Sequence, residues 1–242
     1  MEENWLSRTA LLIGEEGISR LHTARVALLG LGGVGGACAE ALCRAGIGQL
    51  LLCDNDTVSR TNLNRQLAAT CETIGRPKVQ VMAQRLLSIC PSLSLTLCEQ
   101  FYLPENSDFL YAFHPDIVID AIDTVTAKLH LAQECDKRGI PLISCLGTGN
   151  RLSPQELTLG DIAETAGCGC PLARVMRREL KKRGVRRLRV VFSREKPLSC
   201  TTAGEPGGRH PPGSISFVPP VAGYLLAGEA VRLLLSSPAG SE

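Results

Sequence analysis

Apolar residues in the first half of the chain follow two alternating patterns. Short continuous apolar runs predict buried strands at residues 26–29, 50–53, 93–97, 117–121 and 142–145. Between them, apolar residues at helical spacing predict helices over 35–45, 77–87 and 127–138. Strands that alternate with helices form crossover units. The pattern therefore predicts an α/β fold with a Rossmann-like, doubly wound, mainly parallel sheet.

The second half has a different character. Residues 171–183 are predicted as a basic amphipathic helix, 189–192 and 214–218 as strands, and 221–235 as a mostly apolar helix of a core or a subunit interface. The stretch 196–213 is rich in Pro, Gly, Ser and Thr and is predicted as a loop. We therefore expect a mixed C-terminal portion beside the parallel sheet.

Composition places the chain among globular proteins. Its 242 residues are 44% hydrophobic and 21% charged, which suits one soluble domain with a sizeable core. Eleven cysteines occur without regular spacing, as expected for buried thiols in a reducing cytoplasm. The apolar stretch 221–235 includes Glu229 and Arg232 and is too short and interrupted for a membrane span. We expect a cytoplasmic protein without membrane association.

A glycine-rich turn joins the first predicted strand to the helix that follows. Gly30, Gly32, Gly33 and Gly35 fit the dinucleotide-binding fingerprint, in which backbone N–H groups and a helix N-terminus bind phosphate. Asp54 lies 19 residues after Gly35, where a ribose-binding carboxylate is expected. These features alone fit NAD and ATP equally well.

Polar residues downstream favour ATP and the adenylation of a carboxylate. They follow in the order Asp56, Asn62, Arg65, Gln66 and Lys78. When a carboxylate attacks the α-phosphate, negative charge builds up on the phosphates, and guanidinium groups, ammonium groups and Mg²⁺ offset it. A dehydrogenase has no such need for cations at these positions.

Two carboxylates end the strand predicted at 117–121. Asp120 and Asp123 should lie at the same carboxyl edge of the sheet as the glycine turn. One of them can therefore hold Mg²⁺. Capping of the following helix is the alternative for Asp123.

Taken in order, these motifs resemble the ThiF/MoeB superfamily, whose fold is shared with ubiquitin-activating enzymes. The resemblance covers roughly residues 5–235 and implies one adenylating domain over 1–242. Within it, 1–25 would form an N-terminal helical arm, 26–150 a nucleotide-binding half, and 151–242 a substrate and dimerisation half. The resemblance further implies ATP and Mg²⁺ as cofactors and a homodimer as the assembly.

The resemblance also implies roles for individual residues. Asp54 would bind the ribose of ATP, and Asp123 would coordinate Mg²⁺. The phosphates would contact Asn62, Arg65 and Lys78. In the superfamily an arginine of an N-terminal segment reaches across the dimer into the partner's site. Arg8 is the candidate here and Arg20 the second choice, although a surface charge is an alternative for Arg8.

Several segments point to one family within this superfamily. The chain lacks the two Cys-x-x-Cys pairs that hold zinc in many sulfur-carrier adenylyltransferases, and Cys168-Gly-Cys170 has the wrong spacing. These two cysteines and Cys200 are predicted to be the most exposed thiols, with no assigned role. The segments 120–128, 140–150, 170–180 and 213–217 resemble the tRNA threonylcarbamoyladenosine dehydratase family.

That resemblance implies a reaction and leaves rivals open. The family adenylates the threonine carboxylate of the modified adenosine at tRNA position 37. A ureido nitrogen then displaces AMP and closes a hydantoin ring. A sulfur-relay protein is a possible partner. The rivals are activation of the C-terminal glycine of a ubiquitin-like sulfur carrier, an NAD-dependent oxidoreductase, and a non-catalytic tRNA- or nucleotide-binding module.

Positive charge gathers in one stretch of a chain whose net charge is only +2. Nine basic residues and a single acid, Glu179, lie between positions 174 and 189. A phosphate backbone is the natural partner of such a face, although a solvated helix surface is the alternative. The residues predicted to bind tRNA are Arg174, Arg177, Arg178, Lys181 and Lys182.

Overall fold

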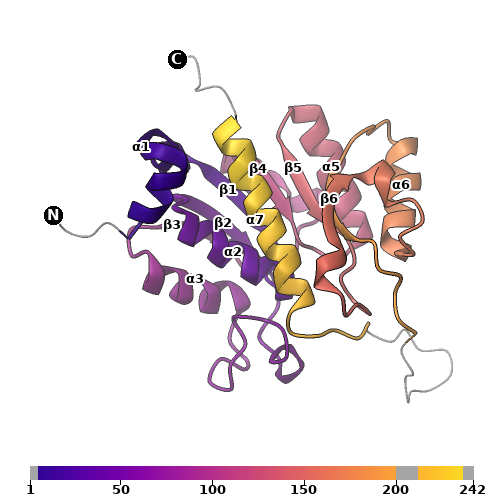
Figure 1. Cartoon of the computed structure of the whole chain (residues 1–242), viewed down its shortest axis with the longest axis horizontal. Coiled ribbons are helices and arrows are strands. Elements are labelled where there is room, and N and C mark those ends of the chain that lie inside the picture. Colours follow the sequence, from indigo (N-terminus) through magenta and orange to yellow (C-terminus); the bar gives the residue numbers. More distant parts are fainter. Residues whose placement is uncertain (1–4, 200–211, 237–242) are drawn as a thin grey trace.

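The computed structural model describes residues 5–199 and 212–236, and its centre is a seven-stranded sheet (Figure 1). The strand order is β3-β2-β1-β4-β5-β7-β6, with six parallel strands and β6 antiparallel to β7. The strands are β1 (Arg25–Leu29), β2 (Gln49–Cys53), β3 (Ser94–Cys98), β4 (Ile117–Asp120), β5 (Leu142–Cys145), β6 (Leu157–Asp161) and β7 (Arg189–Ser193). The predicted doubly wound, mainly parallel sheet with a mixed C-terminal portion is confirmed.

Helices cover both faces of the sheet, because successive residues of a buried strand point to opposite sides. Val26 and Leu28 of β1 face a core shared with α1, α2, α3 and α7. Ala27 and Leu29 face a second core shared with α4 and α5, and α6 packs over β7. The helices are α1 (Ser7–Thr23), α2 (Gly33–Ala45), α3 (Lys78–Ile89), α4 (Asp108–Ala112), α5 (Val125–Arg138), α6 (Pro171–Lys182) and α7 (Val218–Ser236).

The strand predicted at 214–218 is wrong, and one strand was missed. Residues 212–217 form no strand, and α7 already begins at Val218. Proline is compatible with the first turn of a helix, so Pro219 and Pro220 start the helix rather than end a strand. The missed strand is β6, whose short Leu157–Asp161 run pairs with β7 at the sheet edge. The predicted loop 196–213 falls largely outside the described residues.

The apolar helix α7 belongs to the core of this chain. Its 19 residues are long and apolar enough for a membrane span by composition alone. In the structure it lies across α2, as Figure 1 shows, and Ala222, Leu226 and Ala230 are fully buried. Gly223 permits the close approach, since a Cβ there would lie 2.2 Å from the carbonyl oxygen of Val34. The prediction of a buried helix is confirmed.

The prediction of exposed thiols is wrong for Cys168 and Cys170. Cys168 and Cys170 are buried in the core that α6 forms with β7. Cys170 caps α6, because its Sγ accepts the backbone N–H of Ala173 at 3.5 Å. Cys200 lies outside the described residues. Among the described cysteines, the exposed one is Cys71, in the turns between β2 and α3.

Candidate active site

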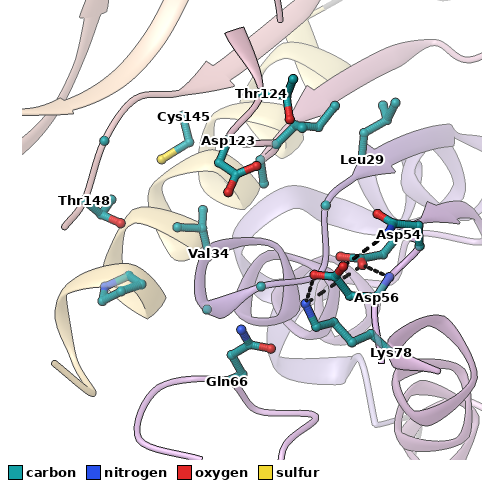
Figure 2. A pocket seen from close by; sticks show the side chains of 18 of the residues that line it. Leu29, Val34, Asp54, Asp56, Gln66, Lys78, Asp123, Thr124, Cys145 and Thr148 are labelled. Atoms are coloured by element: carbon teal, nitrogen blue, oxygen red, sulfur yellow. Dashed lines mark hydrogen bonds and ion pairs between the residues drawn. The ribbon is translucent and has the colours of Figure 1, made fainter. Parts of the chain in front are cut away.

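A cavity of about 820 Å³ opens at the carboxyl ends of the parallel strands. It lies at the topological switch point of the sheet. There β1 lies between β2 and β4, and the helices that follow these two strands, α3 and α5, cover opposite faces of the sheet. Its walls come from the segments that follow β1, β2, β3, β4 and β5, and from the starts of α3, α6 and α7. Figure 2 shows Asp123 and Thr148 on one side and Asp54, Asp56 and Lys78 on the other.

The glycine turn forms the floor of this cavity. Gly30 has φ 91°, and a Cβ there would lie 2.6 Å from the carbonyl oxygen of Ala121. A Cβ on Gly35 would lie 1.7 Å from the carbonyl oxygen of Gly30, so both positions require glycine for packing. Gly32 differs, because the nearest atom to its Cβ position is 3.9 Å away. The middle of the turn is therefore open to a ligand at the N-terminus of α2.

Two carboxylates and a buried ammonium lie beside this turn. Asp54 holds the turn, because Oδ2 accepts the backbone N–H of Leu31 at 2.6 Å. Its Oδ1 accepts the N–H of Asp56 at 2.8 Å. The ammonium of Lys78 donates to Asp56 Oδ2 at 2.7 Å and lies 3.9 Å from Asp54 Oδ1. Only 6% of the Lys78 side chain is exposed, so a positive charge is fixed at the cavity wall with little hydration.

The segment around the short helix η1 (Arg60–Asn62) adds three polar side chains. Asn62 Oδ1 accepts the N–H of Ser59 at 3.0 Å, so the amide nitrogen is the branch available to a ligand. Among the described residues, Arg65 donates from Nη1, to Thr61 O at 3.0 Å and Asn64 Oδ1 at 2.8 Å. Gln66 is 8% exposed, and its buried Oε1 has no hydrogen-bond partner in the described part of the chain. Buried acceptors are normally satisfied, so this atom suits a ligand that donates a hydrogen bond.

The two carboxylates after β4 have different surroundings. Asp120 is fully buried and accepts hydrogen bonds from Lys128 Nζ at 2.9 Å and Ser144 Oγ at 2.6 Å. Asp123 is exposed in the cavity and has no hydrogen-bond partner within residues 5–199 and 212–236. Of the two metal-ligand candidates, the structure leaves Asp123 as the one open to a cation.

Most of the residues predicted for this site do line one cavity. They are Gly30, Gly32, Gly33, Asp54, Asp56, Asn62, Arg65, Gln66, Lys78 and Asp123. Gly35 lies beneath the turn and acts through packing. Arg8 is exposed on α1 and does not line the cavity. Arg20 donates to Leu235 O at 3.2 Å, which gives it a structural role within the chain.

The basic residues of α6 are only partly free. Arg177 donates to the carbonyl and hydroxyl oxygens of Thr165 at 2.7 and 2.5 Å, so it is a structural contact and not part of an open cationic face. Arg178 and Lys182 pair with Glu179, whose pKa they lower to about 2 together with Arg183. Arg174, Arg178, Lys181 and Lys182 are exposed.

Sequence reasoning missed the wall of the cavity opposite the nucleotide motifs. Gly147, Thr148 and Gly149 follow β5, and Leu172 opens α6. Phe101, 57% exposed, follows β3 at the rim. The same rule that located Asp54 and Asp123, a position just after a parallel strand, identifies the β3 and β5 segments. Leu172 lacks such a signal, because its contact depends on how α6 packs.

Two cysteines border the cavity without nucleophilic character. Burial raises the pKa of the Cys53 thiol to about 12, and the neighbouring Cys98 and Asp54 add to the effect. Burial likewise raises the pKa of Cys145 to about 12. Both thiols stay protonated near neutral pH, so they are poor nucleophiles. Among the described residues, no group of three or more His, Cys, Asp or Glu side chains is arranged to hold a metal.

Comparison with known proteins identifies the family. The model of the ThiF family matches residues 6–241. The chain belongs to the ThiF family. A tRNA threonylcarbamoyladenosine dehydratase of Bacillus subtilis (strain 168) is 41% identical over 240 residues, which cover 95% of this ThiF-family chain and 94% of the relative. The resemblance predicted from the sequence motifs is confirmed.

Solved structures agree with this ThiF-family assignment. The tRNA N6-threonylcarbamoyladenosine dehydratase of E. coli in complex with AMP superposes with a TM-score of 0.86 at 32% identity, over 95% of this chain and 93% of that one. The same enzyme in complex with ATP gives a TM-score of 0.85 over 96% and 93%. Both chains are almost fully covered in each superposition, so the likeness extends over nearly the whole fold.

Proposed function

We propose that this chain is an ATP-dependent tRNA threonylcarbamoyladenosine dehydratase. The observation that carries the proposal is a single cavity that joins the glycine turn to the segment after β5 and the start of α6. A nucleotide on the turn would place its phosphates beside an acceptor carboxylate held on the opposite wall. The 41% identity to a dehydratase over nearly the full length of both chains supports that choice of acceptor.

The proposed reaction has two steps. A carboxylate oxygen of the threonyl group attacks the α-phosphorus of ATP, and pyrophosphate leaves. The ureido nitrogen then attacks the activated carbonyl carbon, loses its proton, and AMP leaves as the hydantoin ring closes. The base has then lost one water. No enzyme nucleophile is needed, which is compatible with the protonated thiols of Cys53 and Cys145.

Individual residues have separate proposed tasks. Lys78 and Arg65 offset charge on the phosphates, and the amide of Asn62 donates to them. Asp54 accepts ribose hydroxyls, because each carboxylate oxygen can accept a second hydrogen bond beyond the backbone N–H it already binds. These tasks follow from the side of the cavity on which each group lies.

The cavity fits a magnesium ion, which we propose as the second cofactor. Mg²⁺ is bound through one or two carboxylates together with substrate phosphates and water. The exposed carboxylate of Asp123, without a partner in the described residues, supplies such a ligand across the cavity from Lys78. Mg²⁺ there would neutralise phosphate charge. Asp120 does not compete, because Lys128 and Ser144 donate to its Oδ2 and the backbone N–H of Ile122 donates to its Oδ1.

The direct test uses tRNA that carries threonylcarbamoyladenosine, with ATP and Mg²⁺. Nucleoside mass spectrometry should detect the loss of one water from the modified base, and AMP and pyrophosphate should form in equal amounts. Pyrophosphate release that requires a small ubiquitin-like protein, with no change in the tRNA base, would contradict the proposal. It would favour the carrier-activating rival instead.

We further propose that the exposed face of α6 binds the tRNA near the modified base. Leu172 at the start of α6 lines the cavity, and a 12-residue helix extends about 18 Å from that point. Arg174, Arg178, Lys181 and Lys182 are exposed along it. Phosphates that flank the bound nucleotide would therefore meet positive charge.

Salt dependence of tRNA binding tests this face. The variant Lys181→Gln/Lys182→Gln should bind tRNA more weakly, and its log Kd against log salt slope should fall by about 1–2. The matched control is Arg44→Gln/Arg85→Gln, which removes the same charge from α2 and α3, where both arginines pair with Glu40. Equal effects of the two variants would remove the proposal of a specific α6 face.

We propose a homodimer in which Arg8 acts on the partner's nucleotide. Leu11 and Leu12 follow Arg8 on α1 and are each 86% exposed, an unfavourable arrangement for two adjacent leucines in water. A second copy packed on α1 would cover them and bring Arg8 to another cavity.

Mixing inactive Arg8→Ala and Asp123→Asn chains should restore up to about a quarter of wild-type activity, from mixed dimers with one intact site. A mixture that stays inactive despite exchange of subunits would contradict the role of Arg8.

A further inference from the structure

The mechanism leaves unused a lysine that is fully buried behind the cavity. Lys128 has no exposed surface, and neither do Asp120 and Ser144 around it. Its ammonium donates to Asp120 Oδ2 at 2.9 Å, Ser144 Oγ at 3.1 Å and the carbonyl oxygen of Cys145 at 2.7 Å. All three ammonium protons therefore have an acceptor, and the acceptors come from two different strands.

This network reaches the cavity on both sides. Asp120 ends β4, and its Oδ1 accepts the N–H of Ile122 at 3.1 Å, within the turn that presents Asp123. Cys145 ends β5 and leads directly into the wall segment 146–149. Lys128 therefore fixes the position of the turn that carries Asp123, the proposed metal ligand, relative to the wall segment 146–149.

The position of Lys128 is unfavourable for a positive charge. It is the fourth residue of α5, in the first turn, where the helix dipole disfavours positive charge. The strands it joins are already paired, with Asp120 opposite Ser144 in the parallel ladder. A buried ion pair also contributes little net stability compared with apolar residues of the same volume. Local rules broken in this way are typical of functional sites.

We infer that Lys128 is a positioning residue for adenylation, which fixes Asp123 relative to the wall that receives the acceptor carboxylate. The inference rests on the proposed role of Asp123 in an adenylating site. It extends to any acceptor, since the network touches the cavity walls and not the substrate.

The test separates geometry from stability with three variants. Lys128→Met leaves Asp120 buried without its cation, so it should lower both the melting temperature and kcat. Lys128→Met/Asp120→Asn removes both charges, and the new amide can still donate to Ser144 and accept from Ile122. Leu131→Ala is the matched control, because Leu131 is fully buried one turn further along α5 and lies away from the cavity.

The expected result is a split between stability and rate. In the double variant the melting temperature should recover most of its loss, while kcat for AMP formation stays about 30- to 100-fold low and KM for ATP changes less than about threefold. Leu131→Ala should lose melting temperature and keep kcat, measured well below the transition. Recovery of kcat together with stability in the double variant, or an equal loss of kcat in Leu131→Ala, would overturn the inference. If Lys128→Met does not fold, the double variant and the control decide the question.

Failure of the proposed function is distinguishable in the same experiment. Wild type is assayed in parallel with modified tRNA and with a ubiquitin-like carrier protein. If only the carrier supports pyrophosphate release, the dehydratase proposal fails, and the ratio of variant to wild-type kcat is measured with that acceptor.

Discussion

Replacing Lys78 by methionine is the sharpest test of how the cavity stabilises charge. The change removes one buried ammonium and keeps an unbranched side chain that is shorter by one heavy atom. Lys78 is 6% exposed and donates one proton to Asp56 at 2.7 Å, which leaves two protons for a ligand. We expect a large loss of activity and a small loss of stability, because the charge serves the nucleotide more than the fold.

The magnitude follows from the arrangement of charges. A unit charge about 4 Å from a phosphate oxygen is worth about 4 kcal/mol at an effective dielectric constant of about 20. The carboxylate of Asp56 opposes part of this, so we expect a net loss of about 2–3 kcal/mol, or about 30- to 200-fold in kcat/KM for ATP. The effect on folding should be about 1 kcal/mol or less, since Asp56 is 56% exposed and water can solvate it.

The assay is pyrophosphate release at several ATP concentrations, with thermal unfolding of each variant alongside. Arg76→Met is the matched control, because Arg76 lies two residues away, does not line the cavity, and donates to Gln84 at 2.7 Å. It should keep kcat/KM within about threefold of wild type, as expected for a surface change. A Lys78→Met enzyme that matches wild type in kcat/KM would refute the reasoning. Equal losses of kcat/KM in Lys78→Met and Arg76→Met would show instead that the effect comes from the overall positive charge of this region and not from the position of Lys78 in the cavity.

Three further predictions concern the same cavity. Gly35→Ala should lower the melting temperature and abolish ATP binding, because the new Cβ would lie 1.7 Å from a backbone oxygen. Gly32→Ala should fold normally and lose only ATP affinity. Thermal unfolding measures the stability of each variant, and calorimetry measures its ATP binding. Asp123→Asn should lower kcat by about 100-fold and raise the Mg²⁺ concentration for half-maximal rate, without a change in melting temperature; an unaltered Mg²⁺ titration would contradict its role. In peptide-mapped alkylation at pH 8, exposed Cys71 should react at least about 100-fold faster than Cys145, whose raised pKa of about 12 keeps the thiolate scarce until strongly alkaline pH.

The sequence determined the features that depend on neighbouring residues. Apolar runs located six of the seven strands. Five of them are buried on both faces and therefore almost continuously apolar, whereas β3, at the edge of the sheet, is largely exposed. The glycine turn was equally evident in the sequence. Its glycines are required because a Cβ at Gly35 would clash with the carbonyl oxygen of Gly30, and a Cβ at Gly30 would clash with that of Ala121. Position after a parallel strand then identified Asp54 and Asp123 as residues of one edge.

Only the tertiary structure decided what each charged or polar side chain is free to do. Asp120 and Asp123 are equivalent in the sequence, but a lysine eight residues later on α5 folds back to Asp120 and leaves Asp123 open. Arg177 belongs to a basic run, yet Thr165 binds it. Cys168 and Cys170 lie in a glycine-rich context and are buried nonetheless. In each case the deciding partner comes from a separate element, so hydrogen bonding and burial are fixed by packing between elements and not by local pattern.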